Sequence, residues 1–560
     1  MSSNEERKKI KKFGFYRFIV LAISLAVIAF ILSVAPNYIK SDIANKTNLV
    51  INNNNVTKKL KNDVLVEDNV VYLSQEDIEN YFDGNIYYDS KYDQIITTSN
   101  TKVAVIPIGK KQITLNGSSV KIYAEAVKKN NKYYLPFSEI CKSVYDVETT
   151  YVKNSDTVII TSLDRELTYA NSSKKNSVKY KPTIFSKTIE KISIGDNVTV
   201  VSTEKGWTKI TTQNGKVGYV KENTLVNSQK VRDNFTIEKQ IEGNVSIAWD
   251  YFSEYAKAPA RKEKIEGVNV VSPSFISLKK QGQGEISENI GTQGIDYVTW
   301  AHNNGYKVWA LASNNSMKES TSEVLSDYKL REKLIDNLIN SAIQYNLDGI
   351  NLDFENIYKA DKDNYSRLVI ELAPRLKELG KVLSVDVTAP DGSDDWSLCF
   401  DRNKIAGAAD YIVFMAYDQN GISSAEAGTT AGYDWVETNI NKFLKQENVN
   451  LSKLILGIPF YTRIWKISGD TTKSEIVSMK DTYSKIPSNT NIQWLDDLKQ
   501  NYAEYTQSDI TYKIWIEDTK SITEKLNLIN KYNLSGASFW EKDRESEDIW
   551  NVVSSKLNVK

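Results

Sequence analysis

Three polar residues that alternate along one predicted strand are the strongest candidates for chemistry in this sequence. Residues 348–355 read Asp-Gly-Ile-Asn-Leu-Asp-Phe-Glu, which places Asn351, Asp353 and Glu355 at every second position. Because side chains alternate between the two faces of a strand, these three share one face. Buried carboxyl groups that lie side by side repel each other, so one of them holds its proton more tightly. The spacing therefore predicts a carboxylic acid that stays protonated near neutral pH and can act as a general acid.

This octapeptide resembles the Asp-x-x-Asp-x-Asp-x-Glu signature of glycoside hydrolase family 18, which includes chitinases and bacterial cell-wall glucosaminidases. The resemblance implies that Glu355 is the catalytic acid/base that protonates the glycosidic oxygen. It also implies that Asp353 orients the substrate's 2-acetamido group, whose carbonyl oxygen attacks the anomeric carbon. Since the substrate provides the nucleophile, the second carboxylate that ordinary retaining glycosidases place across the bond is not needed. Asp348 and Asn351 are implied as supporting residues.

Asn351 departs from the commonest form of the signature, which has Asp at this position. Asp353 therefore loses a neighbour with which it could share a proton. Because Asn can still form hydrogen bonds, we expect a changed pH profile rather than a loss of activity.

Three further segments resemble parts of the same family that surround the substrate. The resemblance implies that Tyr417, in Met-Ala-Tyr-Asp at residues 415–418, is a catalytic residue that hydrogen-bonds the acetamido oxygen. It implies that residues 457–465 line the cleft with an aromatic side chain and an arginine, and that a tryptophan of residues 537–540 forms the floor of the sugar subsite. The implied substrate-binding residues are Asp348, Asn351, Met415, Asp418, Gln419, Tyr461, Arg463 and Trp540.

The substrate preference is predicted from a second departure. Residues 312–315 read Ala-Ser-Asn-Asn, where chitinases commonly have Ser-x-Gly-Gly. Residues 353–356, 415–419 and 459–463 look closer to the bacterial peptidoglycan and spore-cortex branch of the family. These motifs favour wall glycan over chitin.

The elements that must position these residues are predicted from about residue 240 onward. Short apolar runs alternate there with longer amphipathic segments, which is typical of parallel β/α folds. The candidate strands are 245–249, 268–272, 307–312, 349–354, 383–387, 411–417, 454–459 and 536–540. Eight strands predict a (β/α)8 TIM barrel over residues 240–556, an α/β fold with its chemistry at the C-terminal strand ends. A helix over residues 365–379 is expected to kink at Pro374 and to be capped by Gly380.

Two small modules are predicted before the barrel. A pattern of one strand, a short helix and two strands occurs twice, and over residues 62–164 it resembles the α+β module named for the N-terminal domain of copper amine oxidases. No copper site follows, because the segment contains no histidine. Residues 177–228 contain Gly206-Trp207 and Gly218-Tyr219 among short alternating strands and resemble a bacterial SH3-like β-barrel. Such domains commonly bind cell-wall peptides, and a spacer role also stays open.

The N-terminus has the residue order of an export signal. A basic tail over residues 1–17 precedes an apolar run over residues 18–36 that is long enough to span a bilayer. We expect a single-pass transmembrane anchor, with the bulk of the chain outside the cell membrane of a Gram-positive-type envelope. Cleavage after the small residues Ser33 and Ala35 is the alternative. Residues 37–61 are rich in Asn, Lys and Thr and predict a flexible stalk.

Composition argues against several other classes of function. The chain has 71 basic and 71 acidic residues, so no field of one sign is available to bind nucleic acid. With one histidine, His302, and two cysteines, Cys141 and Cys399, neither a metal site nor a cofactor is predicted. We expect His302 to be a helix-surface or packing residue and the cysteines to lie in different domains without a disulfide.

Together these features predict a membrane-anchored, extracytoplasmic N-acetylglucosaminidase that cleaves peptidoglycan with retention at the anomeric carbon. Its predicted partners are a polysaccharide with N-acetylated sugars, a cell-wall peptide or glycan at the SH3-like domain, and the membrane. The alternatives are a chitinase or chitooligosaccharide hydrolase, a non-catalytic glycan-binding barrel and an envelope scaffold. Internal and terminal cleavage both stay open, because they depend on the loops at 421–435 and 466–514.

Overall fold

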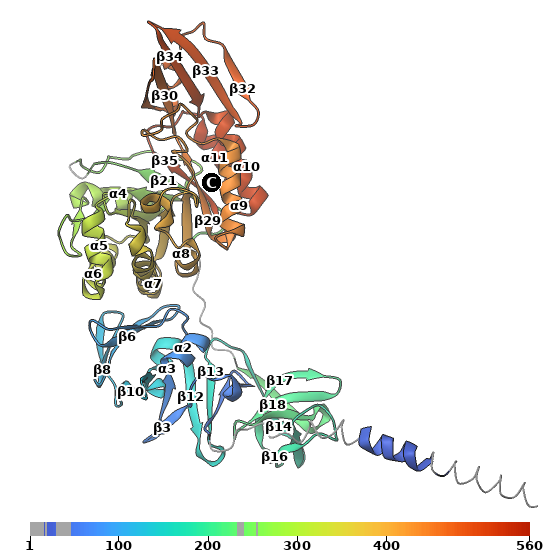
Figure 1. Ribbon diagram of the computed structural model, residues 1–560. Coiled ribbons are helices and arrows are strands. Elements are labelled where there is room, and N and C mark those ends of the chain that lie inside the picture. The colour runs from blue at the N-terminus through green and yellow to red at the C-terminus, as the bar shows by residue number, and fades with distance from the viewer. Residues whose placement is uncertain (1–15, 17–18, 30–45, 232–239, 254–255, 560) are drawn as a thin grey trace, which may run out of the picture. The chain divides into compact units, whose positions relative to one another are not determined.

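The computed structural model describes residues 16, 19–29, 46–231, 240–253 and 256–559, which form two compact units (Figure 1). The first unit contains the described residues of Met1–Thr97 and Ala104–Thr236, and the second those of Thr98–Val103 and Ile237–Lys560. No helix in these described ranges has the length and apolar character needed to cross a bilayer. Part of the predicted N-terminal anchor lies outside the described residues, namely residues 18 and 30–36. The predicted basic tail also lies outside them, apart from Tyr16.

Eight parallel strands close a barrel in the second unit. They are β21 (Val245–Asp250), β22 (Val270–Pro273), β25 (Lys307–Ser313), β26 (Gly349–Asp353), β27 (Val382–Val387), β28 (Tyr411–Met415), β29 (Leu454–Pro459) and β35 (Gly536–Trp540). Each strand pairs in parallel with the next, and β35 pairs with β21 to close the ring. The predicted TIM barrel is confirmed. A short hairpin of β23 (Ile276–Leu278) and β24 (Ile286–Glu288) extends the same sheet beside β25.

Alternation along the strands divides the apolar side chains of the barrel into two cores. On β26, Ile350 and Leu352 point outward and pack in the large cluster between the strands and the helices. On β21, Val245, Ile247 and Trp249 point inward and belong to a second cluster that fills the barrel. Polar residues at inward positions therefore lie either among these apolar side chains or at the barrel mouth.

The helices cover the outside of the barrel, as Figure 1 shows for α4 to α8. They are α4 (Gly291–Asn303), α5 (Lys318–Ser326), α6 (Tyr328–Gln344), α7 (Lys362–Glu378), α8 (Arg402–Ala408), α9 (Tyr433–Lys445), α10 (Thr519–Tyr532) and α11 (Ile549–Leu557). Helix α7 contains Pro374 and ends as predicted, because Gly380 adopts φ +66°. The N–H groups of Gly380 and Lys381 bond to the carbonyls of Lys377 and Leu376, which completes a Schellman cap.

Residues 466–514, expected to act as a loop wall, belong instead to an antiparallel sheet inserted between β29 and β35 (Figure 1). Its strands are β30 (Tyr461–Ser468), β31 (Thr471–Ser478), β32 (Ile492–Leu495), β33 (Gln500–Gln507) and β34 (Ile510–Ile516). The sheet has its own small core, which includes Ile464 and Ile514. A fully buried ion pair connects its end to α10, where Lys525 Nζ lies 2.9 Å from Glu517 Oε2.

The first unit contains the predicted α+β module. The two repeats are β4 (Val70–Ser74), α2 (Gln75–Tyr81), β5 (Tyr87–Asp89) and β6 (Gln94–Thr98), then β11 (Lys132–Leu135), α3 (Phe137–Tyr145), β12 (Val147–Val152) and β13 (Thr157–Ser162). The other strands of the module are β2 (Asn54–Asn55), β3 (Leu65–Glu67), β7 (Val103–Pro107), β8 (Gln112–Leu115), β9 (Ser118–Lys121) and β10 (Val127–Lys129). Cys141 of this module and Cys399 of the barrel are both buried free thiols.

The module begins earlier than predicted, which corrects the stalk assigned to residues 37–61. Strand β1 (Asn48–Ile51) pairs in parallel with β13. Leu49 and Val50 are fully buried there. The Asn-rich surroundings concealed a three-residue apolar run whose partner strand lies about a hundred residues later in the chain, and such long-range pairing is not visible in local composition.

A seven-stranded antiparallel sheet completes the first unit. Its strands are β14 (Leu167–Ser172), β15 (Asn176–Lys179), β16 (Thr188–Ile192), β17 (Asn197–Glu204), β18 (Trp207–Thr212), β19 (Val217–Lys221) and β20 (Leu225–Val231). Strand β14 lies before the predicted start at residue 177 and joins the same sheet. The SH3-like assignment stays a prediction.

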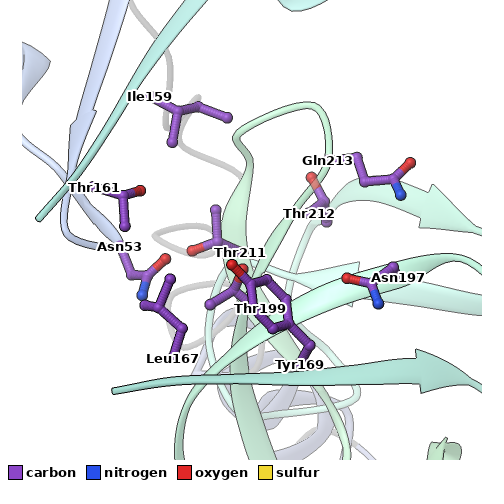
Figure 2. A pocket seen from close by; sticks show the side chains of 10 residues that line it. All are labelled: Asn53, Ile159, Thr161, Leu167, Tyr169, Asn197, Thr199, Thr211, Thr212 and Gln213. Carbon is purple, nitrogen blue, oxygen red and sulfur yellow. The ribbon is translucent and has the colours of Figure 1, made fainter. Parts of the chain in front are cut away.

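A small cavity of about 170 Å³ lies beside this sheet (Figure 2). Its lining is formed by Asn53, Ile159, Thr161, Leu167, Tyr169, Asn197, Thr199, Thr211, Thr212 and Gln213. All of these side chains are uncharged.

Candidate active site

Glu355 lies just beyond the C-terminal end of β26, where barrel enzymes place their chemistry. Its side chain is half-buried. Burial and the nearby carboxylates of Asp353 and Asp418 raise the pKa of Glu355 to about 8. The carboxyl group is therefore protonated at neutral pH, as the sequence predicts, and can donate its proton.

Asp353, the last residue of β26, stands on the same face of the strand. Burial and the neighbouring carboxylate of Asp386 raise its pKa well above the ordinary value for aspartate. Its Oδ1 atom is buried and has no hydrogen-bond partner within the described residues. An unpaired buried acceptor is costly unless another group binds it, so this oxygen is suited to receive an N–H group from a substrate.

Asp386 is a candidate site residue that the sequence analysis missed. It is almost completely buried near the end of β27, and its Oδ1 accepts a hydrogen bond of 2.7 Å from Asn351 Nδ2. Burial raises the pKa of Asp386 well above the ordinary value. The charge of Glu355 raises this pKa further, whereas the hydrogen bond from Asn351 lowers it. Ser384 and Asp386 alternate with apolar residues on β27 as the polar residues do on β26, so the same reasoning would have found this carboxyl.

Asn351 is fully buried inside the barrel, so it contacts the protein rather than a bound sugar. Its Oδ1 accepts hydrogen bonds from Trp249 Nε1 at 2.7 Å and Ser272 Oγ at 3.2 Å. Its Nδ2 donates to Ser384 Oγ at 3.0 Å and to Asp386. The substrate contact implied for Asn351 is therefore corrected to a positioning role.

Asp348 lies at the opposite end of β26 from Glu355, which contradicts its implied role at the substrate. Glu355 lies seven positions after Asp348, or roughly 20 Å along an extended chain. Its carboxylate accepts hydrogen bonds from Val308 N at 3.0 Å and Lys307 Nζ at 3.1 Å and lies 2.7 Å from His302 Nε2. Burial opposes ionisation, but these hydrogen bonds outweigh it and lower the pKa of Asp348. His302 lies on the partly exposed surface of α4, where its ring contacts Asp348.

Tyr417, Asp418, Tyr461 and Arg463 are brought together at the ends of β28 and β29. Asp418 Oδ1 accepts hydrogen bonds from Tyr461 Oη at 2.8 Å and Arg463 Nη2 at 3.1 Å. The rings of Tyr417 and Tyr461 meet edge to face, with centroids 6.3 Å apart. Burial, followed by the neighbouring Tyr461 and the acids of the site, raises the pKa of Tyr417 well above its usual value. Its phenol is therefore protonated and can donate a hydrogen bond.

Met415 and Gln419, the other two residues implied on this segment, support the site from different positions. Met415 is buried as the last residue of β28. Gln419 Oε1 accepts a hydrogen bond of 2.8 Å from the backbone N–H of Gly432. Gln419 therefore fixes the loop before α9.

Trp540 ends β35 and is half-buried at the barrel mouth. Its ring meets Trp249 edge to face and lies tilted against Tyr251, with both centroid distances 5.7 Å. Tyr251 is itself exposed. This aromatic group provides an apolar surface of the kind on which a sugar ring stacks.

Asn314, in the loop after β25, is a second residue that the sequence analysis did not place in the site. Its Oδ1 accepts a hydrogen bond of 3.0 Å from the backbone N–H of Glu355, and its Nδ2 donates one of 2.8 Å to the carbonyl of Glu355. Nδ2 also donates to Thr321 Oγ1 at 3.0 Å. Asn314 is buried, so this double contact fixes the backbone that carries the acid.

No cluster of histidine, cysteine and acidic side chains within the described ranges has the arrangement of a metal site. The site consists of a protonated acid, an acceptor with an unpaired oxygen, a phenol donor and an aromatic platform. Such a set can protonate a leaving oxygen while it binds and orients an amide group.

Comparison with known proteins gives matches over both units. The family model described as "Glycosyl hydrolases family 18" matches residues 247–545, and that of the "Copper amine oxidase N-terminal domain" matches residues 50–160. "Uncharacterized glycosylase YvbX" of Bacillus subtilis is 26% identical over 306 residues, which cover 51% of this chain and 84% of that protein. The "Cortical fragment-lytic enzyme" of Bacillus subtilis is 23% identical over 243 residues, which cover 42% of this chain and 56% of that protein.

A solved structure supports the fold. The chitinase from Chromobacterium violaceum ATCC 12472 superposes with a TM-score of 0.50 at 23% identity. The match covers 57% of this chain and all of that one. The second unit therefore has the barrel fold of that chitinase.

Proposed function

The chain belongs to family 18 of the glycosyl hydrolases, and from that premise we propose that it cleaves β-1,4 bonds of peptidoglycan beside N-acetylglucosamine, with retention at the anomeric carbon. One observation carries the proposal. A protonated Glu355 stands two residues from an Asp353 whose Oδ1 is buried and unpaired. A donor for the leaving oxygen and an acceptor for an amide N–H therefore lie on one strand face.

In the proposed reaction, Glu355 transfers its proton to the glycosidic oxygen as the bond to the anomeric carbon breaks. The carbonyl oxygen of the substrate's own acetamido group forms the new bond to that carbon. Asp353 accepts the acetamido N–H and stabilises the positive charge that develops on this group, and Tyr417 donates a hydrogen bond to its oxygen. Glu355, now ionised, then takes a proton from water, and this water opens the cyclic intermediate from the face that the leaving group occupied. The two inversions give net retention.

Wall glycan is proposed as the substrate on two grounds. A relative that matches 42% of this chain is named as a cortical fragment-lytic enzyme. The loop after β25 has Asn314 and Asn315 where chitinases commonly have glycines. In this chain Asn314 binds the backbone of Glu355, so the departure is part of the site rather than a neutral change.

The proposal places the enzyme outside the cytoplasm and bound to the cell membrane. The basic residues of 1–17 followed by the apolar run of 18–36 support this location. Protease added to intact cells should then remove the barrel and leave a membrane-bound N-terminal fragment. A barrel that becomes accessible only after lysis would contradict the location without affecting the chemistry.

Digestion of purified peptidoglycan tests the activity. The full chain is compared with Glu355→Gln and with Glu323→Gln, which changes an exposed acid on α5. Mass spectrometry of the products should show new N-acetylglucosamine reducing ends for the parent and for Glu323→Gln. Glu355→Gln should release at least about a hundredfold less product. Equal release by Glu355→Gln, or cleavage of chitooligosaccharides but not of peptidoglycan, would contradict the proposal.

A further inference from the structure

Because residue 351 is Asn, β26 offers Asp353 no neighbouring carboxyl group at that position. We propose that Asp386, on the adjacent strand β27, supplies this carboxyl group and shares a proton with Asp353. The proposal rests on the substrate-assisted reaction proposed above. Asp386 is buried and acts through Asp353, so it is a positioning residue rather than one that contacts the sugar.

The strand register brings the two acids together. Strands β26 and β27 are parallel, and Asn351 lies opposite Ser384. Two residues further along each strand come Asp353 and Asp386, so both side chains point to the same face. Adjacent strands are about 4.8 Å apart, which places the carboxyl groups within range of proton sharing or strong repulsion.

The hydrogen bonds of Asn351 determine which way its amide faces. The indole N–H of Trp249 can only donate, so the atom of Asn351 that it contacts must be the oxygen. The amide nitrogen therefore faces Ser384 and Asp386. Asn351 thus holds one oxygen of Asp386 in place without competing for a proton.

The charges around the acids favour a retained proton. Within the described residues, neither Lys nor Arg forms an ion pair with Asp353, Glu355 or Asp386. The other ionisable groups that influence these acids are Tyr365 and Tyr417, both neutral phenols, and Asp418, whose charge is paired with Arg463. Burial raises the pKa of both Asp353 and Asp386, and no cation in the described part of the chain lies beside them, so the pair keeps one proton besides that of Glu355.

The shared proton gives the pair a role in the reaction. Without substrate, the proton lets the unpaired Oδ1 of Asp353 remain buried without a full charge. When the acetamido N–H binds this oxygen, the proton moves from Asp353 to Asp386. Asp353 is then ionised as positive charge develops on the acetamido group, and the total charge of the pair does not change.

Two variants test this role. The first is Asp386→Asn, and the second is the double variant Asn351→Asp with Asp386→Asn, which moves the carboxyl group from β27 to β26. An asparagine at 386 can still accept the hydrogen bond from Asn351, so a merely structural role would survive. It cannot take a proton, so we expect kcat to fall about tenfold to hundredfold. The double variant returns a carboxyl to β26 beside Asp353 and should recover most of the lost kcat. Ser384→Ala is the matched control, because it removes a contact of Asn351 but no carboxyl.

Infrared absorption of protonated carboxyl groups, measured at pH 7 without substrate, provides a readout that does not depend on activity. The band of the shared proton should shift in frequency in Asp386→Asn, because the proton then stays on Asp353 alone, return in the double variant and stay unchanged in Ser384→Ala. Unchanged absorption and kcat in Asp386→Asn would overturn the proposal, as would a double variant no better than the single one. If the parent cleaves no N-acetylated substrate, the proposed function fails, while the infrared measurement still tests the pair.

Discussion

Replacing Glu355 with glutamine should stabilise the barrel as well as inactivate it. The pKa of Glu355 is raised to about 8 by burial and by the carboxylates of Asp353 and Asp418. In the unfolded chain a glutamate ionises near pH 4.3. At pH 7 the unfolded chain has therefore lost this proton, whereas the folded barrel retains it.

The sign and size of the effect follow from this difference in proton binding. Between about pH 4.3 and pH 8 the folded state binds one more proton than the unfolded state, so the free energy of unfolding decreases as the pH rises. At pH 7 the difference costs roughly 3 to 4 kcal/mol, which partial exposure of Glu355 reduces to about 2 to 4 kcal/mol. Glutamine has the same shape and no ionisation, so the variant avoids this cost.

Thermal unfolding of the full chain, followed by tryptophan absorbance or near-ultraviolet circular dichroism, measures the effect. At pH 7, Glu355→Gln should raise the Tm of the barrel by about 3 to 6 °C, and the increase should vanish near pH 4. Glu323→Gln controls for a change of surface charge and should leave the Tm nearly unchanged. A Tm difference that is absent at pH 7, or that grows toward acid pH, would refute the assignment of a raised pKa to Glu355.

Three further predictions concern groups around the acid. Asn314→Ala removes both contacts to the backbone of Glu355 and should lower kcat about a hundredfold with little change in KM. A fluorogenic N-acetylated disaccharide serves as the substrate, and an unchanged kcat would exclude the positioning role. Trp540→Ala removes the apolar platform and should lower kcat/KM by about 10- to 100-fold on the same substrate, whereas Trp540→Phe should lose less. Lys525→Met leaves Glu517 buried without a cation, and denaturant unfolding should show a loss of about 3 to 5 kcal/mol. Adding Glu517→Gln should restore part of that stability, and no restoration would contradict an electrostatic cause.

The parts of the site that could be predicted from sequence are those that depend on local periodicity. Alternation along β26 was sufficient to place Asp353 and Glu355 on one face, and the eight apolar runs correspond to the eight barrel strands. The same alternation misled at Asp348, because a motif treated as one unit ignores that extended chain separates its ends by roughly 20 Å. Asp348 consequently stabilises the opposite end of the barrel.

The contributions that sequence did not reveal come from contacts between distant segments. Asn314 reaches Glu355 from another strand's loop, and Asp386 reaches Asn351 across a strand pair. The alternation along β27 marks the Asp386 carboxyl itself, but neither contact leaves a local signal, because it depends on the register between strands rather than on spacing along one of them. Strand β1 is a similar case, since its partner strand is supplied by residues 157–160.

The central claim is that the acetamido group of the substrate displaces the leaving group while Glu355 donates the proton. Its most direct test compares two oligosaccharides that are identical except that the sugar before the scissile bond carries either an N-acetyl group or a free amine. The parent chain should cleave the N-acetylated compound with a kcat/KM at least about a thousandfold higher, because only this compound provides an internal nucleophile. Equal kcat/KM values for the two compounds would contradict the account.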